Sequence, residues 1–408
     1  MPEAVIVSAA RSPIGRAFKG SMTELRPDDL TATIVRTALD KIPQLDPTEI
    51  DDLYLGCGLP GGEAGFNMAR IVAVLLGYDH LPGATITRYC SSSVQTTRMA
   101  FHAIKAGEGD VFVSAGVEMV SRFVKGNSDT LPDTHNPRFG EAEARTEQAA
   151  QGGTDWRDPR EDGRAPDAYI AMGQTAENVA SLRGLSRREL DEFGVRSQNL
   201  AEKAIDSGFW ANEITPVTIP GSPDGRVVSA DDGPRRGVTL EGVSELKPVF
   251  RPDGVVTAGN CCPLNDGAAA VVVMSDTKAA ELGLTPLARI VSTGVTALSP
   301  EIMGLGPVGA TQQALARAGM SIADIDLVEI NEAFAAQVVP SYQDLGIDLD
   351  RLNVNGGAIA VGHPFGMTGA RLQNTMLNSL TWHNKQIGLI TMCVGGGQGM
   401  ALILERLS

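Results

Sequence analysis

Residues 84–95 read ATITRYCSSSVQ, and they contain one complete unit of the pattern that decides the fold. The run ATITR (84–88) predicts a strand, and a helical pattern begins just after Cys90. The same alternation extends in both directions along the chain. Further strands are predicted at AVIVSA (4–9), DLYLG (52–56) and DVFVSAG (110–116), and an amphipathic helix at 28–41. Because such strands alternate with helices, the sequence predicts an α/β fold with buried sheets.

The middle of the chain has a different composition. From Ser121 to about Pro248 it is rich in Gly, Pro, Asp and Arg, and it contains two helical stretches, 169–182 and 186–207. We expect this part to be a loop-rich layer inserted into the α/β pattern. The segments that follow Cys90 and His363 share one order of helix and strand, which favours an internal duplication.

Length and charge limit the class of protein. The 408 residues suggest two or three domains. A formal net charge of −15 makes the chain a poor electrostatic partner for nucleic acid or an anionic membrane. Five cysteines without a regular framework favour a reduced, intracellular compartment. We find no signal peptide, no C-terminal Ser-Lys-Leu and no apolar run of about 18 residues, so we expect a cytoplasmic protein without a membrane span.

Cys90 is a candidate nucleophile. It lies between the end of a predicted strand and the start of a predicted helix. The helix dipole and unpaired N–H groups at such a position are expected to lower the pKa of a thiol from roughly 8.5 toward neutrality. The alternative is a small buried hydrophobic residue, which is what most free cysteines are.

Cys393 ends an apolar run and is followed closely by three glycines, in TMCVGGGQG (391–399). Glycines allow a close backbone approach, and their N–H groups can form an oxyanion hole. The alternative is a strand-to-turn corner that only requires glycine conformations. The run lacks the G-x-G-x-x-G spacing of dinucleotide sites.

His363 and Asn331 are the other polar candidates. His363 is bracketed by glycine and proline in NGGAIAVGHPFG (355–366), where an imidazole could pair with a thiolate; a histidine bonded to loop backbone is the alternative. Asn331, in VEINEAFAAQ (328–337), could position a water or a substrate oxygen, or could be a helix N-cap. Neither C-x-x-C nor His-x-x-x-His spacing occurs, so no metal site is expected.

Taken together, the motifs resemble the thiolase family, in order and over the whole chain. Cys90 lies in the segment similar to the family's nucleophile segment, and Met172 lies in the one similar to its substrate-facing helix. The matching segments are VIVSAARSPIGR (5–16), TRYCSSS (87–93), AMGQTAENVA (171–180), VTAGNCCPLNDGAAA (256–270), NEAFA (331–335), GGAIAVGHPFG (356–366) and CVGGGQG (393–399).

The resemblance implies a fold of two similar mixed α/β halves stacked in layers (α-β-α-β-α). The first half would comprise residues 1–120 and be completed by about 251–270. The inserted loop domain, 121–250, would close over coenzyme A. Residues 271–408 would form the second half, with His363 and Cys393.

The resemblance also implies a role for each candidate. Cys90 would become acylated, and His363 would activate it and help to bind the thioester oxygen of the condensing substrate. Cys393 would exchange a proton with the substrate α-carbon or the CoA thiol. Asn331 would hold a water that completes this first oxyanion hole. The backbone N–H groups of Cys90 and Gly395 would form a second hole for the acyl-enzyme carbonyl.

Coenzyme A and acyl-CoA would bind as substrates and would contact Met172, Arg235 and Cys262. The resemblance implies no permanently bound cofactor. The family usually forms homodimers or homotetramers. Several positions depart from its pattern: Thr87 replaces Asn, Ser93 replaces Gly, Ala171 replaces a frequent His, and Cys262 and Gly242 replace serines. These departures bear on acyl-chain specificity and on CoA contacts rather than on the chemistry.

The expected activity is therefore CoA-dependent cleavage of a 3-ketoacyl-CoA, or the reverse Claisen condensation, in fatty acid or lipid degradation. The departures at Ala171 and Gly242 favour a longer or bulkier acyl group. Three alternatives remain open. They are a decarboxylating ketoacyl synthase, which would lack Cys393, an idle lipid-binding relative, and an unrelated cysteine hydrolase.

Overall fold

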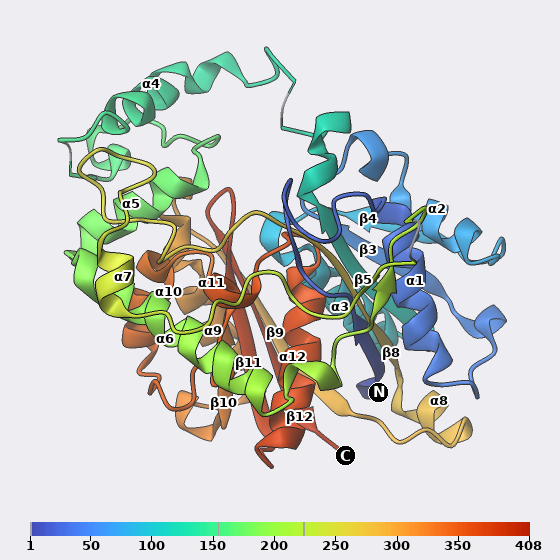
Figure 1. The fold of residues 1–408 in the computed structure, drawn as a ribbon. Coiled ribbons are helices and arrows are strands. Elements are labelled where there is room, and N and C mark those ends of the chain that lie inside the picture. Colours follow the sequence, from blue (N-terminus) through green and yellow to red (C-terminus); the bar gives the residue numbers. More distant parts are fainter. Residues whose placement is uncertain (1, 130, 154, 223–224) are drawn as a thin grey trace.

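The structure is a computed structural model that describes residues 2–129, 131–153, 155–222 and 225–408 (Figure 1). Its strands are β1 Ala4–Arg11, β2 Gly15–Arg16, β3 Asp52–Cys57, β4 Gly83–Ile86, β5 Val111–Met119, β6 Val217–Thr218, β7 Val227–Val228, β8 Asn265–Ser275, β9 Ala288–Ala297, β10 Leu327–Ile330, β11 Ile387–Val394 and β12 Gln398–Arg406. Its α-helices are α1 Pro27–Asp40, α2 Met68–Leu75, α3 Ser92–Ala106, α4 Gly140–Ala149, α5 Met172–Arg183, α6 Arg187–Asp206, α7 Leu240–Ser244, α8 Asp276–Glu281, α9 Gly306–Ala318, α10 Ala335–Leu345, α11 Ala358–Val361 and α12 Thr368–Trp382.

Ten strands form one mixed sheet whose two halves repeat the same pattern. In the N-terminal half, β3 is parallel to β5, and β8 is antiparallel to both β5 and β1. In the C-terminal half, β10 is parallel to β11, and β12 is antiparallel to both β11 and β9. The halves meet where β1 and β9 pair through Val5 with Arg289 and Ile6 with Ala288. This repeated order supports an internal duplication.

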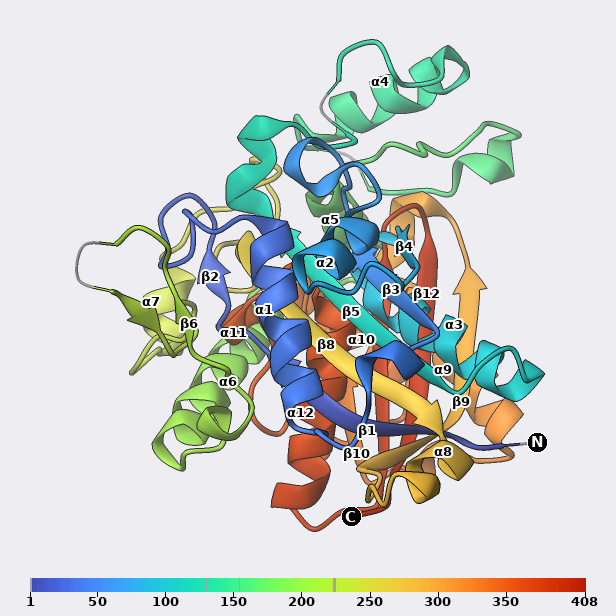
Figure 2. The same ribbon diagram turned by 90° about the vertical axis from the view of Figure 1, so that its right-hand side faces the viewer.

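The helices make the arrangement a five-layered one (Figures 1 and 2). Helices α1 and α2 cover the outer face of the N-terminal half, and α1 packs on β1, β5 and β8. Helices α3 and α12 pack against each other between the two halves. Helix α9 packs on β9, β11 and β12 at the opposite outer face. The α-β-α-β-α order expected from the sequence is therefore confirmed.

The long connection from β5 to β8 carries α4 to α7 and the small β6–β7 pair. The two helices expected at 169–182 and 186–207 are α5 and α6, with ends that differ by a few residues. Both pack on the C-terminal half, where α5 contacts α10 and α6 contacts α10 and α11. These two helices thus cover the C-terminal half, whereas the β6–β7 pair packs on the N-terminal half through Val217 and Val228.

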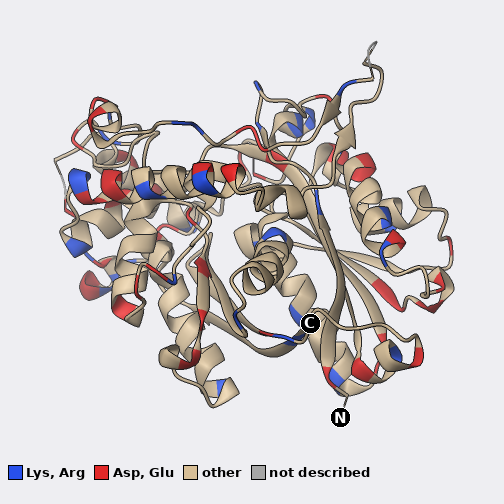
Figure 3. Cartoon of the chain, turned by 60° about the horizontal axis from the view of Figure 1, so that its bottom comes forward, with Lys and Arg blue, Asp and Glu red and all other residues tan. Residues whose placement is uncertain are grey.

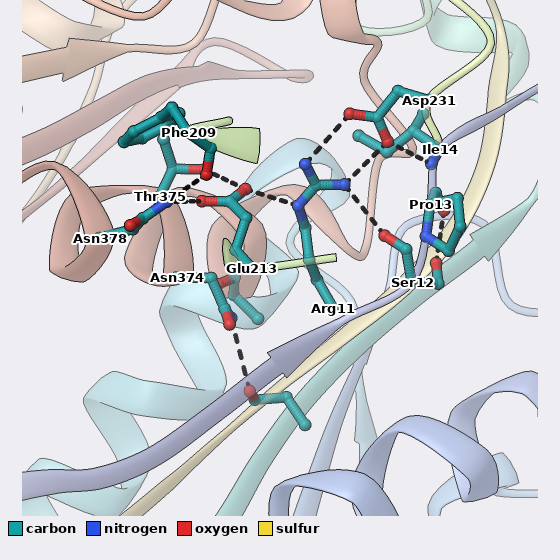
Figure 4. Close-up of polar contacts among 12 residues, drawn as sticks. Arg11, Ser12, Pro13, Ile14, Phe209, Glu213, Asp231, Asn374, Thr375 and Asn378 are labelled. Carbon is teal, nitrogen blue, oxygen red and sulfur yellow. Dashed lines mark hydrogen bonds and ion pairs between the residues drawn. The ribbon is translucent and has the colours of Figure 1, made fainter. Parts of the chain in front are cut away.

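Arg11 anchors this connection to the core (Figure 4). The fully buried guanidinium of Arg11, on β1, donates from Nε to Glu213 (2.5 Å) and from Nη1 and Nη2 to Asp231 (2.8 and 3.0 Å). Glu213 also accepts from Thr375 of α12 at 3.1 Å. Removing one partner from such a buried network typically costs about 3–5 kcal/mol, because it leaves an uncompensated charge.

Figure 3 shows most Lys, Arg, Asp and Glu residues on the outer helices and loops. Within the described part of the chain, no helix is both long and apolar enough to cross a membrane.

Candidate active site

Three strands of the sheet end close to the candidate residues. Cys90 follows β4 in a short 3₁₀ turn, Tyr89–Ser91, that leads into α3. Asn331 follows β10. Cys393 is the penultimate residue of β11 and lies two positions before Gly395. The Cys90 turn packs directly on β11 and on α12, the helix that follows His363. The structure therefore gathers the candidates from both halves of the chain.

Cys90 is buried, and its turn is tightly constrained. Tyr89 has a left-handed backbone (φ 42°), and the N–H of Arg88 donates to the hydroxyl of Ser92 at 2.9 Å. Burial raises the pKa of Cys90 to about 12, although the nearby backbone N–H groups of Gly395 and of Cys90 itself act in the opposite direction. The lowered pKa expected from the sequence is thus wrong, because removal of water outweighs the helix terminus.

Cys393 is fully buried beside Cys90. Burial raises its pKa well above the usual range of a thiol, and the nearby Cys90 adds to the shift. Beyond it, Gly396 and Gly397 have φ values of 77° and 78°, which favour glycine in the turn to β12. A Cβ on Gly395 would lie 3.3 Å from the ring of Tyr89, so this part of the turn is closely covered. Both thiols are therefore protonated in the resting site.

His363 is buried and neutral. Its backbone N–H donates to Oδ1 of Asn265 at 2.9 Å, and its Nδ1 lies 2.6 Å from Oγ1 of Thr368. Its Nε2 is buried and has no hydrogen-bond partner among the described residues. Burial, and to a smaller extent the charge of Arg371, lower the pKa of His363 to about 3. The imidazole therefore offers a lone pair rather than a positive charge.

Asn331 does not cap a helix. Helix α10 begins at Ala335 and has Phe334 as its N-cap, so the alternative that Asn331 is a helix N-cap is wrong. Its backbone N–H donates to the carbonyl of Thr391, two residues before Cys393. Its Oδ1 and Nδ2 are buried, and neither has a partner in the described part of the chain. Two such unpaired groups suit an amide that binds water or substrate.

The residues expected to contact coenzyme A come from three segments. Met172 is the first residue of α5, and its Sδ would lie 3.6 Å from a Cβ on Gly395. Cys262 is part-buried near Cys90 and Cys393. Arg235 is exposed, and its backbone N–H donates to Gln198 at 2.9 Å. Met172 thus lies beside Gly395 and Cys262 lies near the two cysteines, whereas the backbone of Arg235 is held by Gln198 of α6.

The adjacent Arg236 differs from Arg235 in its contacts. The guanidinium of Arg236 forms ion pairs with Glu202 (3.4 Å) and Asp206 (2.6 Å). For the side chain of Arg235, no ion pair or hydrogen bond occurs among the described residues. Within the described part of the chain, Arg235 is therefore the member of the pair whose guanidinium is free to meet a phosphate.

Two departures from the family pattern have structural roles. The hydroxyl of Thr87 donates to the carbonyl of Gly58 at 2.8 Å. The hydroxyl of Ser93 accepts from the N–H of Ala370 at 2.8 Å, so it joins α3 to the start of α12. Both serve to hold the Cys90 segment in place.

Glu118 is a site residue that the sequence interpretation missed. It is buried at the end of β5 and accepts hydrogen bonds from the N–H groups of Gly58 (2.7 Å), Leu59 (3.2 Å) and Gly366 (2.8 Å). Burial raises the pKa of Glu118 to about 7, and these N–H groups oppose the shift. The signal was a carboxylate inside a mostly apolar strand, VFVSAGVEM (111–119). Thr368 was missed as well, although it lies only five residues after His363.

No cluster of His, Cys, Asp and Glu that could hold a metal ion occurs in residues 2–129, 131–153, 155–222 and 225–408.

Two family models cover the chain: "Thiolase, N-terminal domain" matches residues 4–277 and "Thiolase, C-terminal domain" matches residues 284–406. The chain is 41% identical to a 3-ketoacyl-CoA thiolase of Bacillus subtilis, over 99% of this chain and 100% of that protein. It is 43% identical to the 3-oxoadipyl-CoA/3-oxo-5,6-dehydrosuberyl-CoA thiolase of Escherichia coli, over the whole of both chains.

Solved structures agree. The acetyl-CoA acetyltransferase of Bacillus anthracis matches with a TM-score of 0.86 and 38% identity, over 100% of this chain and 99% of that one. The dimeric peroxisomal thiolase of Saccharomyces cerevisiae matches with a TM-score of 0.87 and 34% identity, over 99% and 97%. The chain is an acyltransferase enzyme, and it belongs to the thiolase family.

Proposed function

We propose that the protein cleaves a 3-ketoacyl-CoA with coenzyme A, or runs the reverse condensation, through an acyl group carried on Cys90. The observation that carries the proposal is the pair of buried thiols, Cys90 and Cys393. They lie in a site where Nε2 of His363 and the side-chain amide of Asn331 have no hydrogen-bond partner among the described residues. Cleavage of this carbon–carbon bond needs a soft nucleophile, a proton donor and two traps for negative charge. The site offers one group for each need.

In the proposed reaction, the acyl group is transferred first to Cys90 and then to coenzyme A. The thiol proton of Cys90 moves to Nε2 of His363, and the sulfur bonds to the 3-keto carbon. The bond between carbons 2 and 3 breaks, carbon 2 takes the thiol proton of Cys393, and acetyl-CoA leaves. The CoA thiol then returns a proton to Cys393 and displaces Cys90 from the acyl carbon. Cys90 finally recovers its proton from His363, and the shortened acyl-CoA departs.

Two groups of donors would stabilise the charges. After His363 has taken the proton, its Nε2–H and a water on Asn331 can donate to the thioester oxygen of the enolate. The N–H groups of Cys90 and Gly395 lie close enough to the sulfur to lower its pKa, which supports their use at the acyl carbonyl bound to it. In many acyl-transfer enzymes, hydrogen-bond donors fixed in a buried site make the largest single contribution to the rate enhancement.

The proposal extends to the substrate. We infer a longer or bulkier 3-ketoacyl-CoA, with a role in fatty acid or lipid degradation such as β-oxidation. Ala171 and Gly242, which replace larger family residues, support this inference, and the named relatives act on 3-ketoacyl-CoA and 3-oxoadipyl-CoA. A panel of 3-ketoacyl-CoA substrates ranked by kcat/KM tests it. Highest efficiency with acetoacetyl-CoA would refute the chain-length inference, and no CoA-dependent cleavage of any member would refute the function.

Coenzyme A and acyl-CoA are proposed as substrates that contact Met172, Arg235 and Cys262, without a permanently bound cofactor. We propose three parts for the chain. The N-terminal half comprises residues 1–120 and about 251–270, and the C-terminal half comprises residues 271–408. Residues 121–250 form the cover of the CoA site. The five free cysteines support a cytoplasmic location.

A homodimer or homotetramer is proposed as the working form. Strand β4 ends the described sheet and has no strand partner on its outer edge in the described part of the chain. Beside it, Phe66 is 93% exposed, and Ile71, Val74 and Leu75 of α2 are also exposed. An open strand edge next to exposed apolar side chains is a common site of association. Sedimentation that gives a monomer at micromolar concentration would contradict the proposal.

A further inference from the structure

We propose that Thr368 is a positioning residue that fixes the tautomer of His363, so that the unprotonated Nε2 is the atom that faces the reacting groups. This inference rests on the proposed function of His363 as the base for Cys90. It assigns to Thr368 a role that acts through His363.

The hydroxyl of Thr368 has two close partners and only one proton. Its Oγ1 lies 2.7 Å from the carbonyl oxygen of Pro364, which can only accept, and 2.6 Å from Nδ1 of His363. The hydroxyl proton must therefore point to Pro364, since two facing acceptors at that distance would repel each other. An oxygen lone pair is left for His363, so Nδ1 carries the hydrogen. In a neutral imidazole, Nε2 is then the basic nitrogen.

The surroundings keep this arrangement in place. Thr368 is fully buried, so water cannot easily replace its hydroxyl. The N–H of Thr368 also donates to the Pro364 carbonyl at 3.0 Å, which fixes the acceptor at the start of α12. The ring of His363 packs edge-on against Phe365, with centroids 5.3 Å apart. Rotation of the ring would break its contacts on both sides.

The tautomer matters for the first proton transfer. When the Sγ–H bond of Cys90 breaks, its proton needs a lone pair on His363, and Nε2 is the ring nitrogen without a partner among the described residues. The imidazolium that forms has an N–H at each nitrogen: Nδ1–H donates to Thr368, and Nε2–H is free for the thioester oxygen. With the other tautomer, Nε2 already carries a hydrogen and cannot take the proton.

Three substitutions test the role. Thr368→Ser keeps the hydroxyl and is expected to keep kcat within about twofold, whereas Thr368→Val keeps the shape and removes the hydroxyl. For Thr368→Val we expect kcat and the single-turnover acylation of Cys90 by acetyl-CoA to fall about 10- to 100-fold, the size of the effect when the partner that orients a metal-ligating histidine is lost. The KM for coenzyme A should hardly change. Thr31→Val is the matched control, because Thr31 is a buried threonine that donates to the carbonyl of Pro27 at 2.6 Å in the first turn of α1.

Nitrogen-15 NMR of the histidine rings gives the readout that a purely structural role would not move. The wild-type protein should show His363 protonated at Nδ1, with the signal assigned by its absence from His363→Asn, and Thr368→Val should show a mixture of tautomers. Protonation at Nε2 in the wild type would overturn the proposal, even if Thr368→Val did not fold. Acylation of Thr368→Val at the wild-type rate, or its loss with the tautomer unchanged, would also overturn it. A wild-type protein that forms no acyl-Cys90 would instead refute the proposed function.

Discussion

Oε2 of Glu118 accepts a hydrogen bond from the N–H of Gly366 at 2.8 Å, so a carboxylate of the N-terminal half holds the loop that carries His363. The same carboxylate accepts from Gly58 and Leu59, which follow β3. The position of the histidine relative to Cys90 therefore depends on a contact between segments that are 248 residues apart.

Replacing Glu118 by Gln should loosen this connection. An amide has one acceptor oxygen and places its NH₂ against N–H donors, so at least one buried N–H loses its partner. Each such loss costs about 1–3 kcal/mol. We expect a lower free energy of unfolding in urea and a kcat reduced by about tenfold or more, since misplacement of a base by even a fraction of an ångström slows proton transfer. Glu108→Gln, at an exposed position, is the control. Unchanged stability and kcat in Glu118→Gln would rule out the anchoring role.

The raised pKa of Glu118 should also make the stability of the protein depend on pH. Burial raises its pKa from 4.5 in the free residue to about 7 in the folded protein. Between these pH values Glu118 has released its proton in the unfolded chain and still holds it in the folded chain. The free energy of unfolding therefore falls as pH rises through this window, by at most about 1.4 kcal/mol per pH unit. Glu118→Gln lacks this dependence. The wild-type minus Glu118→Gln difference in unfolding free energy should therefore shrink from pH 4.5 to 7 and level off above. A difference that grows with pH would contradict the raised pKa.

Alkylation of Cys90 should reflect its raised pKa. Only the thiolate reacts with iodoacetamide, and its fraction rises about tenfold per pH unit below the pKa. Because the pKa is about 12, the inactivation rate should climb steadily from pH 7 to 9. Peptide mapping would verify that Cys90 is the modified residue. A rate that reaches a plateau below pH 8 would mean that the resting cysteine is already a thiolate.

Arg235 and Arg236 offer a matched pair for the coenzyme A site. Arg235→Ala should raise the KM for coenzyme A about tenfold, the effect of losing roughly 1.5 kcal/mol in one charged hydrogen bond, with little change in kcat. Arg236→Ala should leave both constants nearly unchanged, since Arg236 is engaged by Glu202 and Asp206. Steady-state kinetics with coenzyme A as the varied substrate distinguishes the two, and equal effects would remove Arg235 from the site.

Local patterns predicted an α/β fold with buried sheets, and they placed α5 and α6 within a few residues, because helix periodicity and strand alternation are properties of short segments. The layered order of the two halves came from the resemblance to the family. Cys90 was identified as a candidate by its place between a predicted strand and a predicted helix, and His363 and Cys393 by the glycines near them. Glu118 and Thr368 could not be assigned a role in this way, because a role that depends on which backbone groups surround a side chain appears only after distant segments meet. The pKa of Cys90 was predicted in the wrong direction for a related reason. The helix terminus is visible in the sequence, but the exclusion of water from the thiol is a property of the packed site.

In the proposed reaction, Cys90 carries the acyl group while Cys393 only transfers protons. Intact-protein mass spectrometry after incubation with acetyl-CoA tests it most directly, with the variants Cys90→Ala and Cys393→Ala. Cys393→Ala should gain the mass of one acetyl group on the Cys90 peptide and retain it, while turnover falls by about 10²–10⁴, the usual contribution of a general acid–base group. Cys90→Ala should gain no acetyl group and show no turnover. Acetylation of Cys90→Ala together with none of Cys393→Ala would show that the roles are reversed and would contradict the account.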